Sequence, residues 1–211
     1  MVCKYIFDNG NYGLKFVYHK KFIYFVLKHK QINMKKILFT LLFASVAMTC
    51  TFGQTVKLEV GMKAPEWTFP DASKEKFTMN SWPGKVLQIN YVDPDVSDLN
   101  DPFNDYIDKA ADIDKRINKD FFKGFGIVDC KSTWKPNGLI RLIAGNKAKK
   151  YDTTILFDYD GVLQSDWGMP KNNYTVVIVD KNRVVRAKYE GEIPASEHEK
   201  IVQLIIGLTQ E

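Results

Sequence analysis

Apolar segments that alternate between strand-like and helix-like spacing follow one another from residue 86 almost to the end of the chain. Short apolar runs bounded by Pro, Gly or Asp predict strands at residues 86–92, 121–129, 153–157, 176–179 and 184–189. Helical spacing predicts helices at residues 101–117, 136–150 and 196–208, and a short helix or turn at 161–167. This order predicts an α/β fold with a mixed sheet and helices on both faces.

Three local signals refine the boundaries of these elements. Asp101 followed by Pro102 predicts a helix that starts with Asp101 as its N-cap. The segment SEHE at residues 196–199 matches a capping box and predicts the start of the last helix. Between the last two strands, we expect Asn182 to take the left-handed conformation that a tight hairpin turn needs.

Residues 34–53 have the layout of a secretory signal peptide. A basic start (MKK, residues 34–36) precedes an apolar run at 37–48, and Thr51 and Gly53 are the small residues of a cleavage site. The apolar run is shorter than the about 20 residues that a membrane span needs. The sequence therefore predicts cleavage before Gln54 and a periplasmic or secreted mature chain. A retained N-terminal anchor and a lipoprotein acylated at Cys50 are the alternatives.

Residues 1–33 are rich in Lys, Tyr and Phe and precede the predicted signal peptide. Because signal peptides begin at the initiator Met, we interpret residues 1–33 as an over-extended start or a disordered leader. A basic aromatic segment lying on a membrane is the alternative. Residues 1–53 carry eight Lys or Arg and one Asp, whereas residues 54–211, read as one domain, carry 22 basic and 24 acidic residues. The mature domain therefore shows no sign of binding nucleic acid, and we expect membrane contact only through an uncleaved leader.

Several motifs within residues 56–209 resemble the thioredoxin-like superfamily, in its peroxiredoxin and membrane-tethered thioredoxin branch. The segment GMKAPEW (61–67) is similar to the opening of that branch, and WPGKVL (82–87) to its lead into the first core strand. The segments ILFDYDG (155–161), WGM (167–169) and TVVIVD (175–180) are similar to its third strand, short helix and hairpin, in the same order. The resemblance implies a thioredoxin-like three-layer sandwich.

The departures from that pattern concern the chemistry. Val96 and Leu99 stand where the redox cysteines of the family would be, and Tyr174 stands where the family has a cis proline. Thiol–disulfide exchange needs a thiolate and a second sulfur, and Cys130 is the only cysteine after residue 53. The chain resembles most the YtfJ family of exported thioredoxin-fold proteins. Because the redox cysteines are missing, we expect a binding or interaction module without a cofactor, and the sequence contains no convincing catalytic constellation.

The resemblance also indicates where such a module would bind. Its working surface would bring Asp93, Asp95 and Asp98 near Tyr174, with Trp134 close by. The expected partner is a periplasmic protein, a peptide or a small ligand with basic or cationic groups. The carboxylates would also suit Ca²⁺ or Mg²⁺, but the calcium-loop pattern is absent, and we predict no metal.

Two catalytic alternatives remain open. Cys130, followed by Lys131, is a candidate lone thiol for a redox enzyme, with His198 as the only histidine after the leader. The segment ILFDYDGVL (155–163) is close to the signature of haloacid-dehalogenase-type phosphatases, with Asp158 as nucleophile and Asp160 as general acid. Only 51 residues follow Asp160, which leaves little room for the remaining catalytic residues of that fold.

Overall fold

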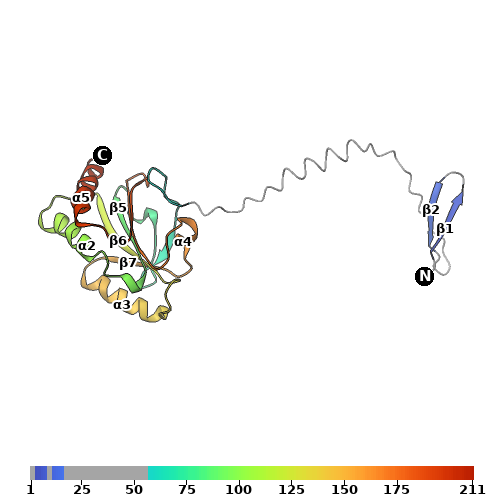
Figure 1. Ribbon diagram of the computed structural model, residues 1–211, viewed down its shortest axis with the longest axis horizontal. Coiled ribbons are helices and arrows are strands. Elements are labelled where there is room, and N and C mark those ends of the chain that lie inside the picture. Colours follow the sequence, from blue (N-terminus) through green and yellow to red (C-terminus); the bar gives the residue numbers. More distant parts are fainter. Residues whose placement is uncertain (1–2, 9–10, 17–56) are drawn as a thin grey trace. The chain divides into compact units, whose positions relative to one another are not determined.

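The chain divides into two units, Met1–Gly53 and Gln54–Glu211. The computed structural model describes residues 3–8, 11–16 and 57–211 (Figure 1). In the first unit, β1 (Cys3–Asp8) and β2 (Asn11–Phe16) pair as an antiparallel hairpin. The predicted signal peptide at residues 34–53, including Cys50, lies outside the described residues, so its cleavage stays a prediction. Among the described residues, no helix has both the length and the apolar character needed to cross a membrane.

Five strands form the central sheet of the second unit. They are β5 (Val86–Val92), β6 (Phe122–Asp129), β7 (Thr154–Asp158), β8 (Tyr174–Val179) and β9 (Val185–Glu190). Their spatial order is β7-β6-β5-β8-β9, with β5, β6 and β7 parallel and with β8 and β9 each antiparallel to its neighbour. The predicted mixed sheet is confirmed, and every predicted strand end lies within two residues of the observed one.

Helices cover both faces of this sheet (Figure 1). The two parallel crossovers, through α2 (Asp101–Asp108) and α3 (Asn137–Lys150), move along the sheet in the same direction. Right-handed connections therefore place both helices on one face, where α5 (Ala195–Gln210) also packs. The other face is covered by α4 (Val162–Asp166), by the hairpin of β3 (Thr68–Pro70) and β4 (Lys76–Thr78), and by η1 (Met79–Ser81).

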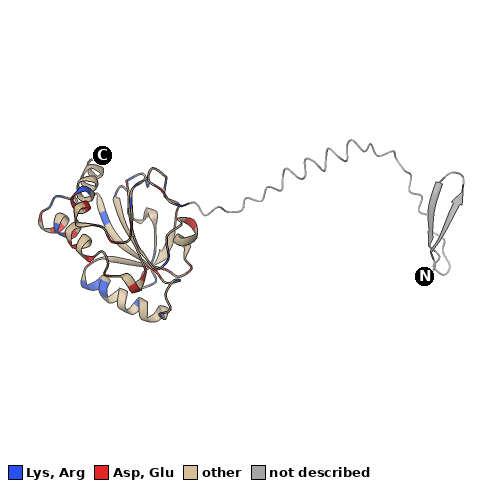
Figure 2. Ribbon diagram, in the orientation of Figure 1, with Lys and Arg blue, Asp and Glu red and all other residues tan. Residues whose placement is uncertain are grey.

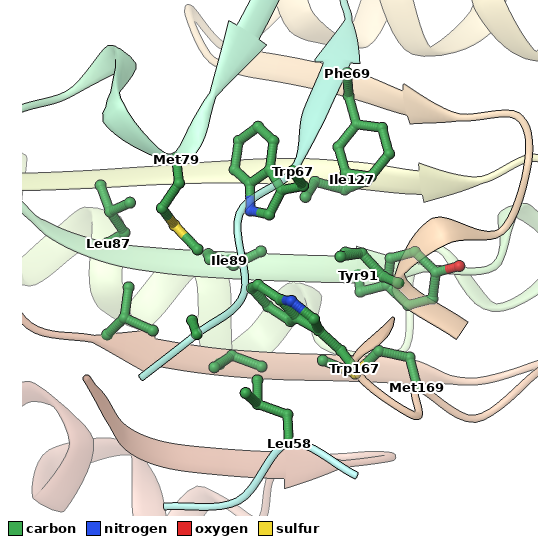
Figure 3. Packing of buried hydrophobic residues seen from close by; sticks show 14 of the residues in the cluster. Leu58, Trp67, Phe69, Met79, Leu87, Ile89, Tyr91, Ile127, Trp167 and Met169 are labelled. Carbon is green, nitrogen blue, oxygen red and sulfur yellow. The ribbon is translucent and has the colours of Figure 1, made fainter. Parts of the chain in front are cut away.

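The core on the α4 face is built around two tryptophans (Figure 3). Trp67 stacks on Phe69 with ring centroids 5.3 Å apart. Trp167 is completely buried, and its indole Nε1 donates a hydrogen bond of 3.1 Å to the carbonyl of Pro65. The sheet contributes apolar side chains from alternate strand positions, namely Leu87, Ile89, Tyr91, Phe125, Ile127 and Leu156.

On the opposite face, α2 and α5 cover the half of the sheet that contains β5, β8 and β9. Phe103 and Ile107 of α2 are buried in the same cluster as Ile201 and Ile205 of α5. The sheet side of this cluster is formed by Val86, Tyr174, Val176, Ile178 and Ala187. The inner face predicted for the last helix is thereby confirmed at Ile201, Ile205 and Leu208, which are buried; Leu204 is half-buried.

Two predicted helix starts are wrong by one or two residues. Asp101 is the first residue of α2, whose N-cap is Asn100, so Asp101 does not cap the helix. The last helix begins at Ala195 after Pro194, and no side-chain hydrogen bond caps it. Proline fixes φ near the helical value and favours an early helix start, which leaves the SEHE segment inside the first turn.

In the hairpin between β8 and β9, Arg183 rather than Asn182 takes the left-handed conformation, with φ of 66°. The Arg183 side chain is buried, and its guanidinium donates to the carbonyls of Trp82 and Lys85, both at 2.7 Å. These two hydrogen bonds hold the arginine in a conformation that L-residues rarely adopt.

The helix after β5 changes its winding before it ends. α2 runs into a π-helical turn, η3 (Lys109–Ile113). Ile113 is 73% exposed, although the predicted helical spacing places it on the inner face. A π turn rotates the following residues relative to the core, since each turn holds an extra residue. Ile117, beyond the helix, is buried again.

Glu199 of α5 ties this helix to α2 and to the segment after it. It forms an ion pair with Arg116 and accepts hydrogen bonds from Gln203 at 2.7 Å and from the Tyr106 hydroxyl at 2.8 Å. The Arg116 guanidinium, helped by Gln203 and Tyr106, lowers the pKa of Glu199 from 4.5 to about 2. A carboxylate held in this way stabilises the fold only while it is ionised.

We expect Glu199→Gln to flatten the acid side of the stability curve. Because the folded pKa of about 2 lies below the ordinary value of 4.5, the contribution of Glu199 is complete above pH 4.5 and is lost as the pH falls towards 2. The variant should therefore be less stable than the native chain at neutral pH and should converge with it near pH 2. Urea unfolding at a series of pH values measures the difference, and a gap that stays constant over this range would contradict the assignment.

Candidate functional site

The carboxyl ends of β5, β6 and β7 meet at one edge of the sheet. Val92 pairs with Val128, and Asp129 pairs with Asp158, so Asp93, Asp129 and Asp158 end three neighbouring strands. All three aspartates are buried. This edge is where open α/β sheets bind their ligands. Among the described residues, however, no group of three His, Cys, Asp or Glu side chains is arranged to hold a metal ion.

Asp158 holds the start of α4. Its Oδ1 accepts a hydrogen bond from the backbone N–H of Val162 at 2.9 Å, and its Oδ2 accepts one from Leu163 at 3.0 Å. Asp160, the second acidic residue of the phosphatase-like segment, is exposed on the same turn. Both oxygens of the proposed nucleophile are therefore engaged by the first turn of a helix.

Asp129 has a similar role in the loop that follows β6. Its Oδ1 accepts from the backbone N–H groups of Lys131 and Ser132, both at 3.1 Å. Its Oδ2 accepts from Gln164 Nε2 of α4 at 2.6 Å. The carboxylate thus joins the loop after β6 to α4.

Asp93 lies beneath the loop that corresponds to the predicted working surface. It is 2% exposed, and its Oδ1 accepts from the backbone N–H of Asp95 at 2.7 Å. Its own N–H donates to the carbonyl of Asn173 at 3.0 Å, which brings the two predicted loops together. Burial raises the pKa of the Asp93 carboxyl. Its Oδ2 is buried as well and receives no hydrogen bond from the described residues. Because the whole side chain is buried, Asp93 adds no carboxylate to the surface.

Asp95, Asp98 and Trp134 form the exposed part of the predicted surface. Asp95 forms an ion pair with Lys135 and accepts a hydrogen bond of 3.4 Å from Thr133 Oγ1, which lays the loop carrying Trp134 beside it. Lys135 also lowers the pKa of Asp95. The side chain of Asp98 is 84% exposed and Trp134 is 85% exposed. These three residues present a small polar and aromatic area to solvent.

Tyr174 is buried instead of lying on that surface. It is 3% exposed, packs with the α2 and α5 cluster, and accepts a hydrogen bond from Asn104 Nδ2 at 3.0 Å. Burial raises the pKa of its hydroxyl to about 12. No cis peptide bond occurs among the described residues, so Tyr174 does not reproduce the cis-proline geometry. The exposed surface is accordingly smaller than predicted, because Asp93 and Tyr174 lie beneath it.

Val96 and Leu99, which the sequence resemblance places at the positions of the redox cysteines, pack against the α2 and α5 cluster. Val96 ends η2 (Pro94–Val96), a short 3₁₀ turn that Asp93 caps. Both side chains are half-buried and apolar. The loop therefore offers apolar contacts where a redox protein of this fold would present sulfur.

Cys130 is buried in a separate small hydrophobic cluster. It is 6% exposed and packs with Ile140 and Phe157. Burial, reinforced by Asp129 and Asp158, raises the pKa of the thiol to about 12. The next residue, Lys131, donates from its Nζ to the carbonyl of Asp160 at 2.9 Å.

His198, the histidine considered as a partner for Cys130, belongs to a different part of the core. Its Nε2 lies 3.1 Å from the carbonyl oxygen of Ile193. Its ring packs against Phe103 and Tyr106 of α2, with centroids 5.4 and 5.5 Å away. These contacts place His198 in the interface between α2 and α5. They give no support to a dyad of Cys130 and His198.

A groove between α2 and α3 is the feature that our sequence analysis missed. Its volume is about 680 Å³, and its floor is formed by β5 and β6. Figure 2 shows acidic positions along α2 and basic positions at one end of α3. Residues of both helices line the groove. One signal in the sequence is the pair Gly124 and Gly126, since glycines inside a strand often mark a close approach by another group.

We compared this fold with the folds of solved structures. A putative thiol:disulfide interchange protein DsbE from Chlorobium tepidum matches with a TM-score of 0.52 at 17% identity, covering 72% of this chain and 99% of that one. A putative protein disulfide isomerase from Bacteroides thetaiotaomicron matches with a TM-score of 0.53 at 16% identity, covering 73% and 92%. The fold is thioredoxin-like. The exposed lipoprotein thioredoxin Etrx1 of Streptococcus pneumoniae, at 14% identity and a TM-score of 0.51, covers 68% of this chain and is itself covered completely.

The thioredoxin-like fold predicted from the sequence is thus confirmed. Likeness at these identities concerns the fold alone. No family model matches the sequence, and no curated protein shows a significant match. The function of the thioredoxin-like domain has to be inferred from its own residues.

Proposed function

We propose that the thioredoxin-like domain is a non-catalytic binding or interaction module. The observation that carries this proposal is the environment of Val96 and Leu99, which stand at the family's cysteine positions and pack into the α2–α5 cluster. Thiol–disulfide exchange proceeds through a thiolate and a mixed disulfide, and neither side chain supplies a sulfur. The edge of the sheet that carries redox chemistry in this fold is here free to serve binding.

A thiol enzyme that uses Cys130 alone is the competing proposal. Its nucleophile would be a buried thiol with a pKa of about 12, which at neutral pH is almost entirely protonated. His198 is occupied in the α2–α5 interface and is not positioned by any observed contact to deprotonate Cys130. The structure offers the thiol neither activation nor easy access.

We expect neither insulin reduction nor peroxide consumption above the background without protein. Because the only thiol after residue 53 is buried and protonated, Cys130→Ser should behave like the native domain in both assays. An active thioredoxin measured in parallel is the positive control. If the native chain shows turnover and Cys130→Ser does not, the proposal of a non-catalytic module is wrong and the proposal of a thiol enzyme is supported.

The module is proposed to act outside the cytoplasm. This part of the proposal rests on residues 34–53, with their basic start, apolar run and small residues before Gln54. The chain resembles the YtfJ family, whose members are exported and have a thioredoxin fold without the redox cysteines. The phosphatase alternative has no supporting observation, because both Asp158 oxygens accept backbone hydrogen bonds.

A further inference from the structure

The floor of the groove between α2 and α3 is polar in the middle of the central sheet. Gln88 and Asn90 project from β5 on the same face as Val86 and Val92. Central strands of such sheets are covered on both faces and are usually apolar throughout. Two adjacent amide side chains at this place therefore need a physical explanation.

The amide groups form a chain that leaves one acceptor unused. Gln88 Nε2 donates to Asn90 Oδ1 at 3.3 Å and to Asn104 Oδ1 at 3.2 Å. Asn104 Nδ2 in turn donates to the Tyr174 hydroxyl at 3.0 Å. Gln88 is 2% exposed, yet its Oε1 receives no hydrogen bond from the described residues. A buried acceptor without a donor is destabilising, so this oxygen favours a ligand that brings an N–H group.

The unused oxygen lies beside Gly124 of the neighbouring strand, which has no side chain, and Gln88 lines the groove. A methyl group on Gly124 would lie 3.9 Å from Gln88 Oε1, in ordinary van der Waals contact. A methyl group on Gly126 would meet nothing nearer than Ile155 at 3.8 Å. Neither glycine has a positive φ, so the backbone does not demand glycine at either position. The effect of the two glycines is to keep the floor open.

The α2 side of the groove is a row of carboxylates at helical spacing. Asp101, Asp105, Asp108 and Asp112 all line it. At a rise of about 1.5 Å per residue, neighbouring members of the row are roughly 4.5–6 Å apart along the helix axis. The π-helical turn begins directly after Asp108, and such turns are frequent at functional sites.

Two of these carboxylates, Asp105 and Asp108, form no ion pair with a described residue. Lys119 pairs with Asp112 at 2.6 Å, and Lys147 lies 3.9 Å from Asp101. Within residues 57–211, no cationic side chain lies within 4.0 Å of Asp105 or Asp108. The middle of the row therefore favours a bound cation.

The α3 side of the groove is apolar along its first turns and ends at Lys147. Ile140, Ile143 and Ala144 line it at helical spacing, and Ile143 is 57% exposed although it faces the groove. Apolar surface left open in this way favours burial against methylene groups. A ligand that satisfies all three sides needs positive charges, N–H donors and a hydrocarbon chain.

We propose that the groove binds a linear aliphatic polyamine. Its ammonium groups lie along Asp105 and Asp108, its methylene chain lies against Ile140 and Ile143, and one of its N–H groups donates to Gln88 Oε1. This inference rests on the proposed binding function and adds the ligand's chemistry and its place in a groove that Pro94 and Ser97 of the Asp95 loop also line.

Calorimetric titration of the full chain with spermidine tests the proposal, together with two variants. Gly126→Leu places a side chain in the groove without backbone strain, and we expect it to abolish binding. The double variant D105N/D108N keeps the size of both side chains but removes their charge, and we expect it to weaken binding at least about tenfold. The amide resonances of Gly124 and Gly126 should shift when spermidine is added to the native chain.

The matched control is D160N/E192Q, which removes two exposed carboxylates that do not line the groove. Its affinity for spermidine should equal that of the native chain. Absence of binding by the native chain, or equal weakening in the control and in D105N/D108N, would overturn the polyamine site. Either outcome would leave the non-catalytic module intact, because that proposal depends on the redox assays instead.

Discussion

Replacing Trp167 by alanine is expected to lower the free energy of unfolding by about 3–5 kcal/mol, the range for large aromatic side chains removed from a core. Trp167 is fully buried in the cluster on the α4 face (Figure 3). The truncation also removes the hydrogen bond from its indole to Pro65. A typical domain is stable by about 5–15 kcal/mol, so this single change would remove a large share of the total.

Urea unfolding followed by far-ultraviolet circular dichroism measures this loss without depending on tryptophan fluorescence. Trp134→Ala is the matched control, because Trp134 is 85% exposed and its removal should change stability by less than about 0.5 kcal/mol. Equal losses in the two variants would contradict the central position assigned to Trp167. A loss below about 1 kcal/mol at Trp167 would do the same.

The fold could be predicted because its determinants are local and ordered along the chain. The strands are short apolar runs closed by Pro, Gly or Asp, and the last helix repeats apolar residues at its inner positions. Predicted details failed where a tertiary contact decides the local conformation. Arg183 holds a left-handed φ because its guanidinium is anchored to Trp82 and Lys85, which are about a hundred positions away in sequence.

The candidate site was harder to predict, because exposure and pairing depend on packing. Asp93 and Tyr174 have the polar character of surface residues, but the sheet edge buries both of them. The groove needs three separate segments at once, since its floor, its acidic side and its apolar side come from β5 and β6, α2 and α3. In the sequence, the signals of this groove are Gly124 and Gly126 within a strand and the aspartates of α2 at helical spacing.

Asp158 shows how one motif supports two different interpretations. In sequence, the segment at 155–163 is close to a phosphatase signature, in which the first aspartate is a free nucleophile. In the structure, the Asp158 carboxylate is completely buried and accepts the N–H groups of Val162 and Leu163. A nucleophile can be replaced without loss of stability, whereas a buried acceptor for two backbone donors cannot.

We therefore expect Asp158→Ala to lower the free energy of unfolding by about 3 kcal/mol, because it leaves two backbone donors at the start of α4 without an acceptor. Asp160→Ala, on the same turn and exposed, should leave stability within about 0.5 kcal/mol of the native chain. Urea unfolding of the two variants gives both values, and hydrolysis of p-nitrophenyl phosphate with Mg²⁺ is assayed in parallel. A stable Asp158→Ala variant that has lost a measurable phosphatase activity would refute the structural role and revive the catalytic one.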